Sequence, residues 1–293
     1  MYYFLTLTAG VMISLMVAFN GGLTETYGIY HATSIIHLVG LIIIALIVLI
    51  KREKPFAKKY SWVLYMGGAI GVFTTVSNNL SFGRISVSAI LALMLLGQSV
   101  AGITVDRYGL FGMPKHPFSK HKVFGLILVL AGIAAMISDF EIIAVTFSFA
   151  AGILIVISRS LNAKLGELTS IRVGTFYNYL VGFIVTLPVL LLLGGNEIPI
   201  TEFTFSPHWY IYLGGVLGVC VLTICNITVI KISAFYLTLL LFVGQVFSGI
   251  IVDMVISQEV SHRIIIGGAL VTAGLCLDLI LDRRKSQKSI KEA

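Results

Sequence analysis

The sequence contains little charge for its length. Asp, Glu, Lys and Arg make up only 11% of its 293 residues, against roughly 25% in a typical soluble domain. Hydrophobic residues reach 58%, and the mean hydropathy is +1.01. A water-soluble protein of this size could not hide that much apolar surface in one core. The composition therefore excludes an ordinary soluble domain and predicts a chain surrounded by lipid.

Cysteine is scarce, and the common catalytic and metal-binding motifs are absent. Cys220, Cys225 and Cys276 lie in apolar runs at no metal-binding spacing, so we interpret them as small buried hydrophobic side chains. The patterns HExxH and GxSxG do not occur, and neither do P-loop or EF-hand spacings. We therefore expect no metal, no cofactor and no enzymatic activity.

Acidic residues are fewer than basic ones, 13 against 20, which gives a formal net charge of +7. Basic proteins often bind nucleic acid, but here Lys and Arg occur in short loops between apolar runs rather than on one aromatic-bearing face. That distribution is typical of the positive-inside rule of membrane proteins. We expect a lipid bilayer, and no nucleic acid, as a partner.

Ten apolar runs are long enough to cross a bilayer, which takes about 20 mostly apolar residues. In hydrocarbon every backbone polar group needs an internal partner, and no run alternates with the period of two of a membrane barrel, so we expect α-helices. The predicted spans are residues 3–27, 31–50, 61–82, 85–106, 122–138, 142–165, 171–193, 208–229, 232–255 and 263–281.

The loop charges predict the orientation of these helices. If both termini are cytoplasmic, every Lys and Arg except Arg84 and Arg263 falls on the cytoplasmic side. The longest loop on the other side, residues 194–208, contains two Glu and no Lys or Arg. We therefore predict a multi-pass protein of the cell (inner) membrane with both termini in the cytoplasm.

The second half of the chain repeats the first. GQSVAGITVD at residues 97–106 returns as GQVFSGIIVD at residues 244–253. An offset of 142 pairs Asn20 with Asn162, and the pattern YxGGxxG at residues 65–71 recurs at an offset of 147. The chain is therefore an internal duplication, with small changes of length between helices, where they are tolerated.

The number of helices in each half fixes how the two halves are related. Five is an odd number, so the halves must enter the membrane in opposite directions. We predict an all-α integral membrane protein with ten transmembrane helices in two inverted five-helix repeats, residues 1–139 and residues 140–293, the second ending in a short, loose cytoplasmic tail. Because the duplication places both inverted halves in one chain, we expect a monomer that acts as a pseudo-dimer.

These motifs resemble those of a known family. The early Asn20, the glycine-rich pattern at residues 65–71 and the Gly-Gln motif at residues 97–106 have the order and spacing seen in the drug/metabolite transporter superfamily. More closely, the chain resembles a bacterial branch of small five-helix membrane proteins of undefined function, here in the fused ten-helix form. The resemblance covers residues 3–281 and implies a transporter of a small solute.

Gln98 and Gln245 are repeat-equivalent and lie near the middle of their predicted helices. A polar side chain at that depth is costly unless it faces a partner or a cavity. We predict that the two amides bind solute in a central cavity. The alternative is an interhelical hydrogen bond, worth about 1 kcal/mol in membranes.

Asn20, Asn162 and Arg159 complete the predicted substrate-binding set. The two Asn residues are a symmetry-related pair, whereas Arg159 is equivalent to Val17 and breaks the symmetry. A single deep cation would suit an anionic or zwitterionic solute. Alternatively, Arg159 snorkels to the lipid head groups and the Asn residues serve packing.

Glu25 and Glu167 form another equivalent pair, placed toward opposite sides of the membrane by the inversion. They are candidates for gating or for carrying a coupling proton. The alternative is that both are solvated surface carboxylates, with Glu167 paired to Lys164 three residues away.

The leading functional hypothesis is a secondary transporter of a small metabolite or drug-like solute, which works by alternating access between the inverted repeats. One alternative is a non-transporting membrane scaffold whose small-residue helix faces contact partners. The other is an intramembrane enzyme, which would need a nucleophile–base pair or metal ligands at membrane depth.

Overall fold

The computed structural model describes residues 1–110, 127, 128, 130–132, 134, 135, 141–197, 204–228, 234–257 and 262–291. These ranges contain helices and short connections, and no β-strand. The predicted span 122–138 lies largely outside the described residues. The α-helices are α1 Tyr2–Tyr27, α2 Ile29–Ile50, α3 Trp62–Ser81, α4 Val87–Tyr108, α6 Ile142–Leu168, α7 Ile171–Leu193, α8 Leu213–Thr228, α9 Ala234–Ser257 and α10 His262–Lys291.

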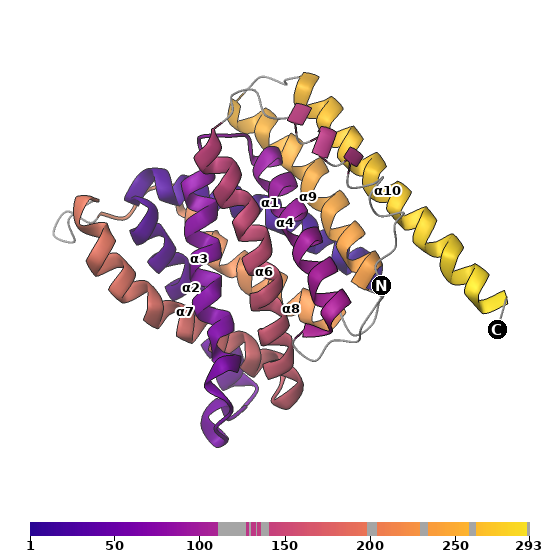
Figure 1. Ribbon diagram of the computed structural model, residues 1–293. Helices are drawn as coiled ribbons and strands as arrows, with labels where there is room; N and C mark the ends of the chain where they lie inside the picture. Colours follow the sequence, from indigo (N-terminus) through magenta and orange to yellow (C-terminus); the bar gives the residue numbers. More distant parts are fainter. Residues whose placement is uncertain are drawn as a thin grey trace.

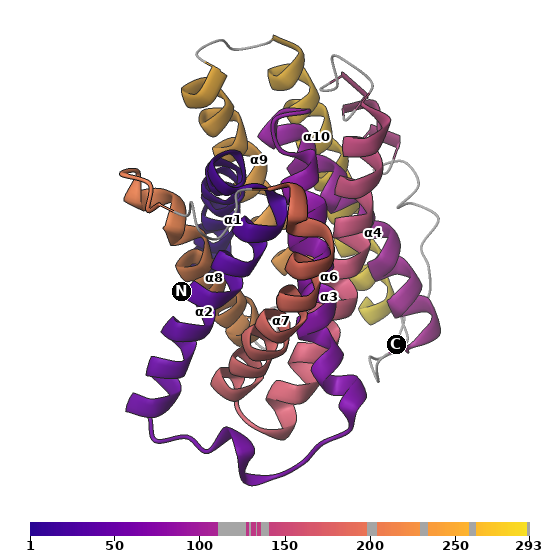
Figure 2. The ribbon, with the colours of Figure 1, turned by 90° about the vertical axis from the view of Figure 1, so that its left-hand side faces the viewer.

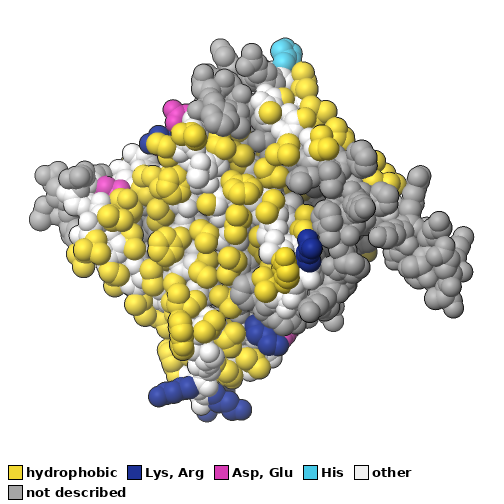
Figure 3. All heavy atoms as spheres, in the orientation of Figure 1, with side chains coloured by type: hydrophobic (Ala, Val, Ile, Leu, Met, Phe, Trp, Pro, Cys, Tyr) yellow, Lys and Arg dark blue, Asp and Glu magenta, His cyan; other side chains and the backbone are white. Residues whose placement is uncertain are grey.

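The helices have the length and composition of membrane spans. Within the described part of the chain, six helices are long and apolar enough to cross a bilayer, and shorter apolar segments lie in α9 and α10. Large hydrophobic side chains such as Phe73, Phe147 and Ile184 are exposed. Figure 3 shows hydrophobic side chains covering the middle of one face, with Lys and Arg at its lower edge. The predicted all-α membrane fold is confirmed.

Helix α3 is long enough to span but is not among those six, because its second half is polar. Thr74, Thr75, Asn78 and Asn79 follow one another in its last turns. A helix with such a face is stable at membrane depth only where that face is covered by protein or lines a cavity. α3 is therefore expected to lie against other helices.

The C-terminal segment differs from the prediction. The last helix was expected to end near residue 281 and to be followed by a loose tail, but α10 continues to Lys291. Residues 282–291 are rich in Lys and Arg, which lose little rotamer freedom in a helix. The helix therefore continues past its apolar part, and Figure 1 shows this end extending away from the bundle.

The two halves pack on each other through equivalent glycines. A Cβ on Gly10 of α1 would lie 2.9 Å from the Cα of Gly244 on α9. At the equivalent crossing, a Cβ on Gly97 of α4 would lie 3.0 Å from the Cα of Gly152 on α6. Only glycine permits such close backbone approach. Since Gly10 is equivalent to Gly152 and Gly97 to Gly244, one pseudo-twofold axis relates both crossings.

The direction of the helices shows that the repeats are inverted. On α2 and α7, Gly40 packs against the ring of Tyr179 and Gly182 packs against the ring of His37. Residue numbers rise along α2 as they fall along α7, so these equivalent helices are antiparallel. Helices α4 and α9 are antiparallel too. The end of α9 lies beside the start of α4, where Val87 N donates to the Asp253 carboxylate at 2.8 Å.

Two groups of three helices form the centre of the bundle. Helices α1, α2 and α8 pack on one another, and so do their equivalents α6, α7 and α3. In Figure 1, α3 and α6 lie toward the viewer with α1 and α8 behind them. The two groups meet along α2 and α7, and the pseudo-twofold axis passes between them.

Candidate functional site

A cavity of about 150 Å³ lies between the two groups of helices. Its lining comes from α1, α2 and α8 on one side and from α3, α6 and α7 on the other, with Met94 contributed by α4. The lining residues are Ile13, Met16, Val17, Asn20, Ile36, His37, Gly71, Thr74, Thr75, Asn78, Asn79, Met94, Ile155, Ser158, Arg159, Asn162, Asn178, Tyr179, Gly214, Gly218, Val221, Leu222 and Cys225.

The cavity is centred on the pseudo-twofold axis. The repeat offsets of 142 and 147 pair most of its lining residues with each other, as in Asn20 with Asn162 and His37 with Tyr179. A position on the axis between inverted repeats is where transporters of such architecture bind their substrates. The structure brings three predicted site residues to this cavity: Asn20, Asn162 and Arg159.

Asn162 is held by a hydrogen-bond chain that connects three helices. Its Nδ2 donates to Asn178 Oδ1 of α7 at 2.7 Å and to Ser158 Oγ at 3.3 Å, one turn earlier on α6. Ser158 Oγ donates in turn to the Gly67 carbonyl of α3 at 2.8 Å. This chain fixes the amide rotamer and makes one side of the cavity rigid and polar.

Asn20 occupies the equivalent position without the equivalent partners. The residues that correspond to Ser158 and Asn178 are Met16 and Ile36, which offer no hydrogen bond. Asn20 is 8% exposed, and its Oδ1 has no hydrogen-bond partner among the described residues. Asn78 Oδ1 is in the same state. Both amide oxygens are therefore buried acceptors that the described residues leave without a hydrogen bond.

Arg159, whose repeat equivalent is Val17, lines the cavity. It makes no hydrogen bond or ion pair with any residue that the structure describes, and none of the described lining residues is Asp or Glu. The cavity wall thus has one permanent positive charge without a counter-charge from the described part of the protein.

His37 and Tyr179 are a second equivalent pair in the lining. The His37 ring is buried, and its Nδ1 donates to the Thr33 carbonyl at 2.9 Å, which leaves Nε2 as the remaining ring nitrogen. The two rings lie 6.0 Å apart between centroids. The sequence analysis did not select them, although their repeat equivalence at mid-helix was visible.

Gln98 and Gln245 are not among the residues that line the cavity. Their backbones lie at the glycine crossings: a Cβ on Gly152 would be 3.0 Å from Gln98 N, and a Cβ on Gly10 would be 3.1 Å from Gln245 N. Gln245 is buried, and its Oε1 has no partner among the described residues. The backbones of both residues thus lie at helix–helix contacts, and the predicted role of their amides in binding solute stays a prediction.

We expect Gln245→Met to retain transport. The substitution keeps side-chain length and removes a buried acceptor that has no partner among the described residues, so the melting temperature should stay equal or rise. The measurement is solute flux per folded molecule together with thermal melting. Asn162→Leu is the comparison, because it breaks the chain to Asn178 and Ser158. A loss of flux in Gln245→Met with unchanged melting would restore Gln245 to the site.

Glu25 and Glu167 are exposed and do not line the cavity. Glu167 accepts a hydrogen bond from Lys164 Nζ at 2.9 Å, the surface pair that their spacing suggests. Their predicted role in coupling or gating stays a prediction.

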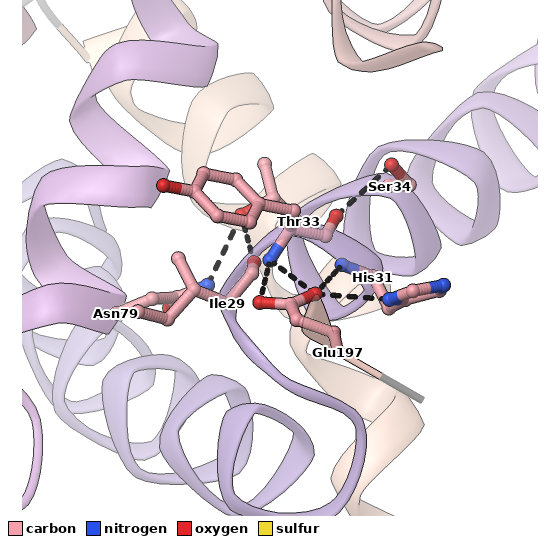
Figure 4. A network of polar contacts seen from close by, with 7 residues as sticks. Ile29, His31, Thr33, Ser34, Asn79 and Glu197 are labelled. Carbon is pink, nitrogen blue, oxygen red and sulfur yellow. Dashed lines mark hydrogen bonds and ion pairs between the residues drawn. The ribbon is translucent and has the colours of Figure 1, made fainter. Parts of the chain in front are cut away.

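Two other carboxylates, which the sequence analysis did not select, hold helix starts at opposite ends of the molecule. Glu197, which follows α7, accepts from Tyr30 N at 3.0 Å, from His31 N at 3.1 Å and from His31 Nδ1 at 2.9 Å. Figure 4 shows this carboxylate at the first turn of α2, close to the hydrogen bond from Asn79 Nδ2 to Thr33 Oγ1. Charged acceptors at such positions satisfy free helix amides and complement the helix dipole.

Glu53 has the corresponding position at the other end. It belongs to the connection between α2 and α3, and this connection runs along the lower edge of Figure 2. Its carboxylate accepts from Ser170 Oγ and from Arg172 Nε at the start of α7. Because α7 begins beside Glu53 and ends beside Glu197, the two contacts are separated by the length of that helix. Neither carboxylate has an exact repeat equivalent, which is why the repeat alignment did not reveal them.

Comparison with known families finds a match that occurs twice along the chain. A family model described as "Putative inner membrane exporter, YdcZ", of the drug/metabolite transporter type, matches residues 1–135 and again residues 143–277. The two matches confirm the resemblance drawn from the motifs, as well as the internal duplication in fused form.

A solved structure described only as "Crystal structure of protein" is similar to the whole chain. The TM-score is 0.66 at 14% identity, over 97% of this chain and 96% of that one. At that identity the likeness supports the fold alone. No curated protein matches the sequence.

Proposed function

Since the chain belongs to the YdcZ family of inner membrane exporters, we propose that it is a multi-pass transporter of the inner membrane and that it moves a small solute by alternating access around the central cavity. The observation that supports this proposal is the cavity itself. It lies on the axis between inverted repeats and is lined by polar groups that neither lipid nor tight packing would require.

The contacts at the two ends of the bundle fit this mechanism. Alternating access needs one end to separate while the other stays closed. Glu197 joins the start of α2 to the segment after α7, and Glu53 joins the start of α7 to the segment after α2. Since α2 and α7 are repeat equivalents, opening one contact while keeping the other would exchange the two end states.

The proposal includes orientation and assembly. Both termini face the cytoplasm, as the loop charges predict, and export is the direction of net movement that the family description suggests. The monomer is the working unit, because both helix groups that line the cavity come from one chain. A scaffold would have no need of a polar cavity on the axis.

Reconstituted vesicles test the function. Purified protein is inserted into liposomes loaded in turn with anionic, neutral and cationic metabolites, and efflux is followed under imposed ion gradients. We expect efflux of one chemical class, saturable and dependent on protein. Efflux equal to that of protein-free vesicles for every solute, from protein shown to be folded by its thermal melting, would overturn the transport proposal.

A further inference from the structure

The two sides of the cavity have a common origin but opposite polarity. Where repeat-equivalent lining residues differ in polarity, the polar member lies on the α3/α6/α7 side every time. The pairs, with that member second, are Met16 and Ser158, Val17 and Arg159, Ile36 and Asn178, Val221 and Thr74, Leu222 and Thr75, and Cys225 and Asn78.

This distribution is not what packing alone would produce. The polar members come from both halves of the sequence, with α3 from the first repeat and α6 and α7 from the second. Duplication placed the same residues on both sides, so the difference arose afterwards and follows the walls of the cavity rather than the repeats. Asn20 and His37 are the polar groups that remain on the apolar side.

The polar wall also has a net charge. Arg159 has no ion-pair partner among the described residues, and the described lining contains no carboxylate. A permanent cation in a site of low dielectric attracts an anion strongly and repels a cation. Val17 lines the cavity at the equivalent position of the other wall, so the charge belongs to one wall only.

The cavity volume limits the size of what can bind. A cavity of about 150 Å³ is roughly the size that holds benzene when it is lined by apolar side chains. A solute here would therefore consist of one charged group and one small ring or branched chain. Such a molecule can satisfy both walls at once, with its charge on the polar side and its hydrocarbon part against Met16, Ile36 and Val221.

We propose that the substrate of this site is a small amphipathic anion, a monocarboxylate with a compact apolar group, whose carboxylate pairs with Arg159. This inference rests on the proposed transport function for its biological meaning, but it concerns binding, which can be measured without transport.

Three probes of nearly the same shape separate charge from size: benzoate is anionic, benzamide is neutral and benzamidine is cationic at neutral pH. Acetate adds a carboxylate without a ring. The full chain in lipid nanodiscs is titrated with each probe, and binding is followed by calorimetry and by the shift in melting temperature. We expect benzoate to bind more tightly than benzamide and than acetate, and benzamidine to show no binding.

Arg159→Gln tests the residue assignment. It should weaken benzoate by roughly tenfold or more, the usual effect of losing a charged hydrogen bond, and should remove the preference for benzoate over benzamide. Arg159→Lys should restore most of that preference. Arg84→Gln is the matched control, because Arg84 pairs with Glu141 at 3.7 Å outside the cavity and should leave all affinities unchanged.

Each outcome decides one of the two proposals. Absence of benzoate binding, a preference for benzamidine, or a benzoate affinity unaffected by Arg159→Gln would overturn the inference about the substrate class. Vesicle efflux of a cation would leave the transport proposal standing and overturn this one. Benzoate binding that depends on Arg159, with no efflux of any solute, would instead overturn transport and keep the anion site.

Discussion

Gly152→Ala is expected to destabilise the protein by about 1–3 kcal/mol, the usual range for overpacking a closely packed contact. The added methyl group would overlap the Met94 carbonyl and lie 3.0 Å from Gln98 N. Both obstacles are backbone atoms, so no side-chain rotation can make room, and α4 and α6 would have to separate. The measurement is thermal melting in detergent, with the folded fraction from size-exclusion chromatography.

The control lies on the same helix. A Cβ on Gly166 would meet only Ile171 Cα, at an ordinary 3.8 Å, among the described residues. There Gly→Ala should stabilise by about 0.5–1 kcal/mol, because alanine loses less backbone entropy in a helix. Gly10→Ala should reproduce the loss seen at Gly152, since the axis relates the two crossings. Equal melting temperatures for Gly152→Ala and Gly166→Ala would show that the crossing is not tightly packed.

The sequence predicts this architecture well because the duplication is visible in it. Conserved offsets between the halves show which helices are equivalent, and five spans per half require inversion. The glycine-rich motifs mark the crossings, but a sequence does not tell which neighbour faces inward. At Gly97-Gln98 and Gly244-Gln245 we predicted a binding role for the polar residue, whereas the structure shows that the glycine makes the close contact between helices.

The lining of the cavity was predicted only in part, for a related reason. Asn20, Asn162 and Arg159 were found from depth and symmetry. The polarity difference between the walls depends on which helices share a side, and that follows from packing of α3 with α6 and α7. Thr74, Thr75 and Asn178 can be recognised as parts of one polar wall only when the packing of those helices is known. The carboxylates Glu53 and Glu197 lie in connections, where neither periodicity nor symmetry indicates contacts.

Gly71→Leu is expected to block transport while the fold stays intact. Gly71 lines the cavity, and a Cβ there would lie at ordinary contact distances, 3.7 Å from Asn178 Oδ1 and 3.9 Å from Ser158 Oγ. The leucine side chain therefore enters the cavity rather than a helix contact. Both polar neighbours keep their present hydrogen bonds, to Asn162 and to Gly67. In a space of about 150 Å³, little room for a solute remains.

Two readouts check this result, and one of them does not depend on the identity of the solute. Cys225 lines the same cavity, so in a Cys220→Ser, Cys276→Ser background its modification by methyl methanethiosulfonate reports access. We expect Gly71→Leu to slow both modification and vesicle efflux by at least roughly tenfold, since a cavity of this size holds only one small molecule, with a melting temperature close to that of the parent.

Gly71→Ala is the matched control, because it makes the same change of backbone freedom but adds a single methyl group. It should keep most of the cavity, and with it most of the efflux and of the Cys225 modification rate. If Gly71→Leu transports as well as Gly71→Ala while Cys225 is protected, the solute takes another route through the protein, and the cavity on the axis is not the transport site.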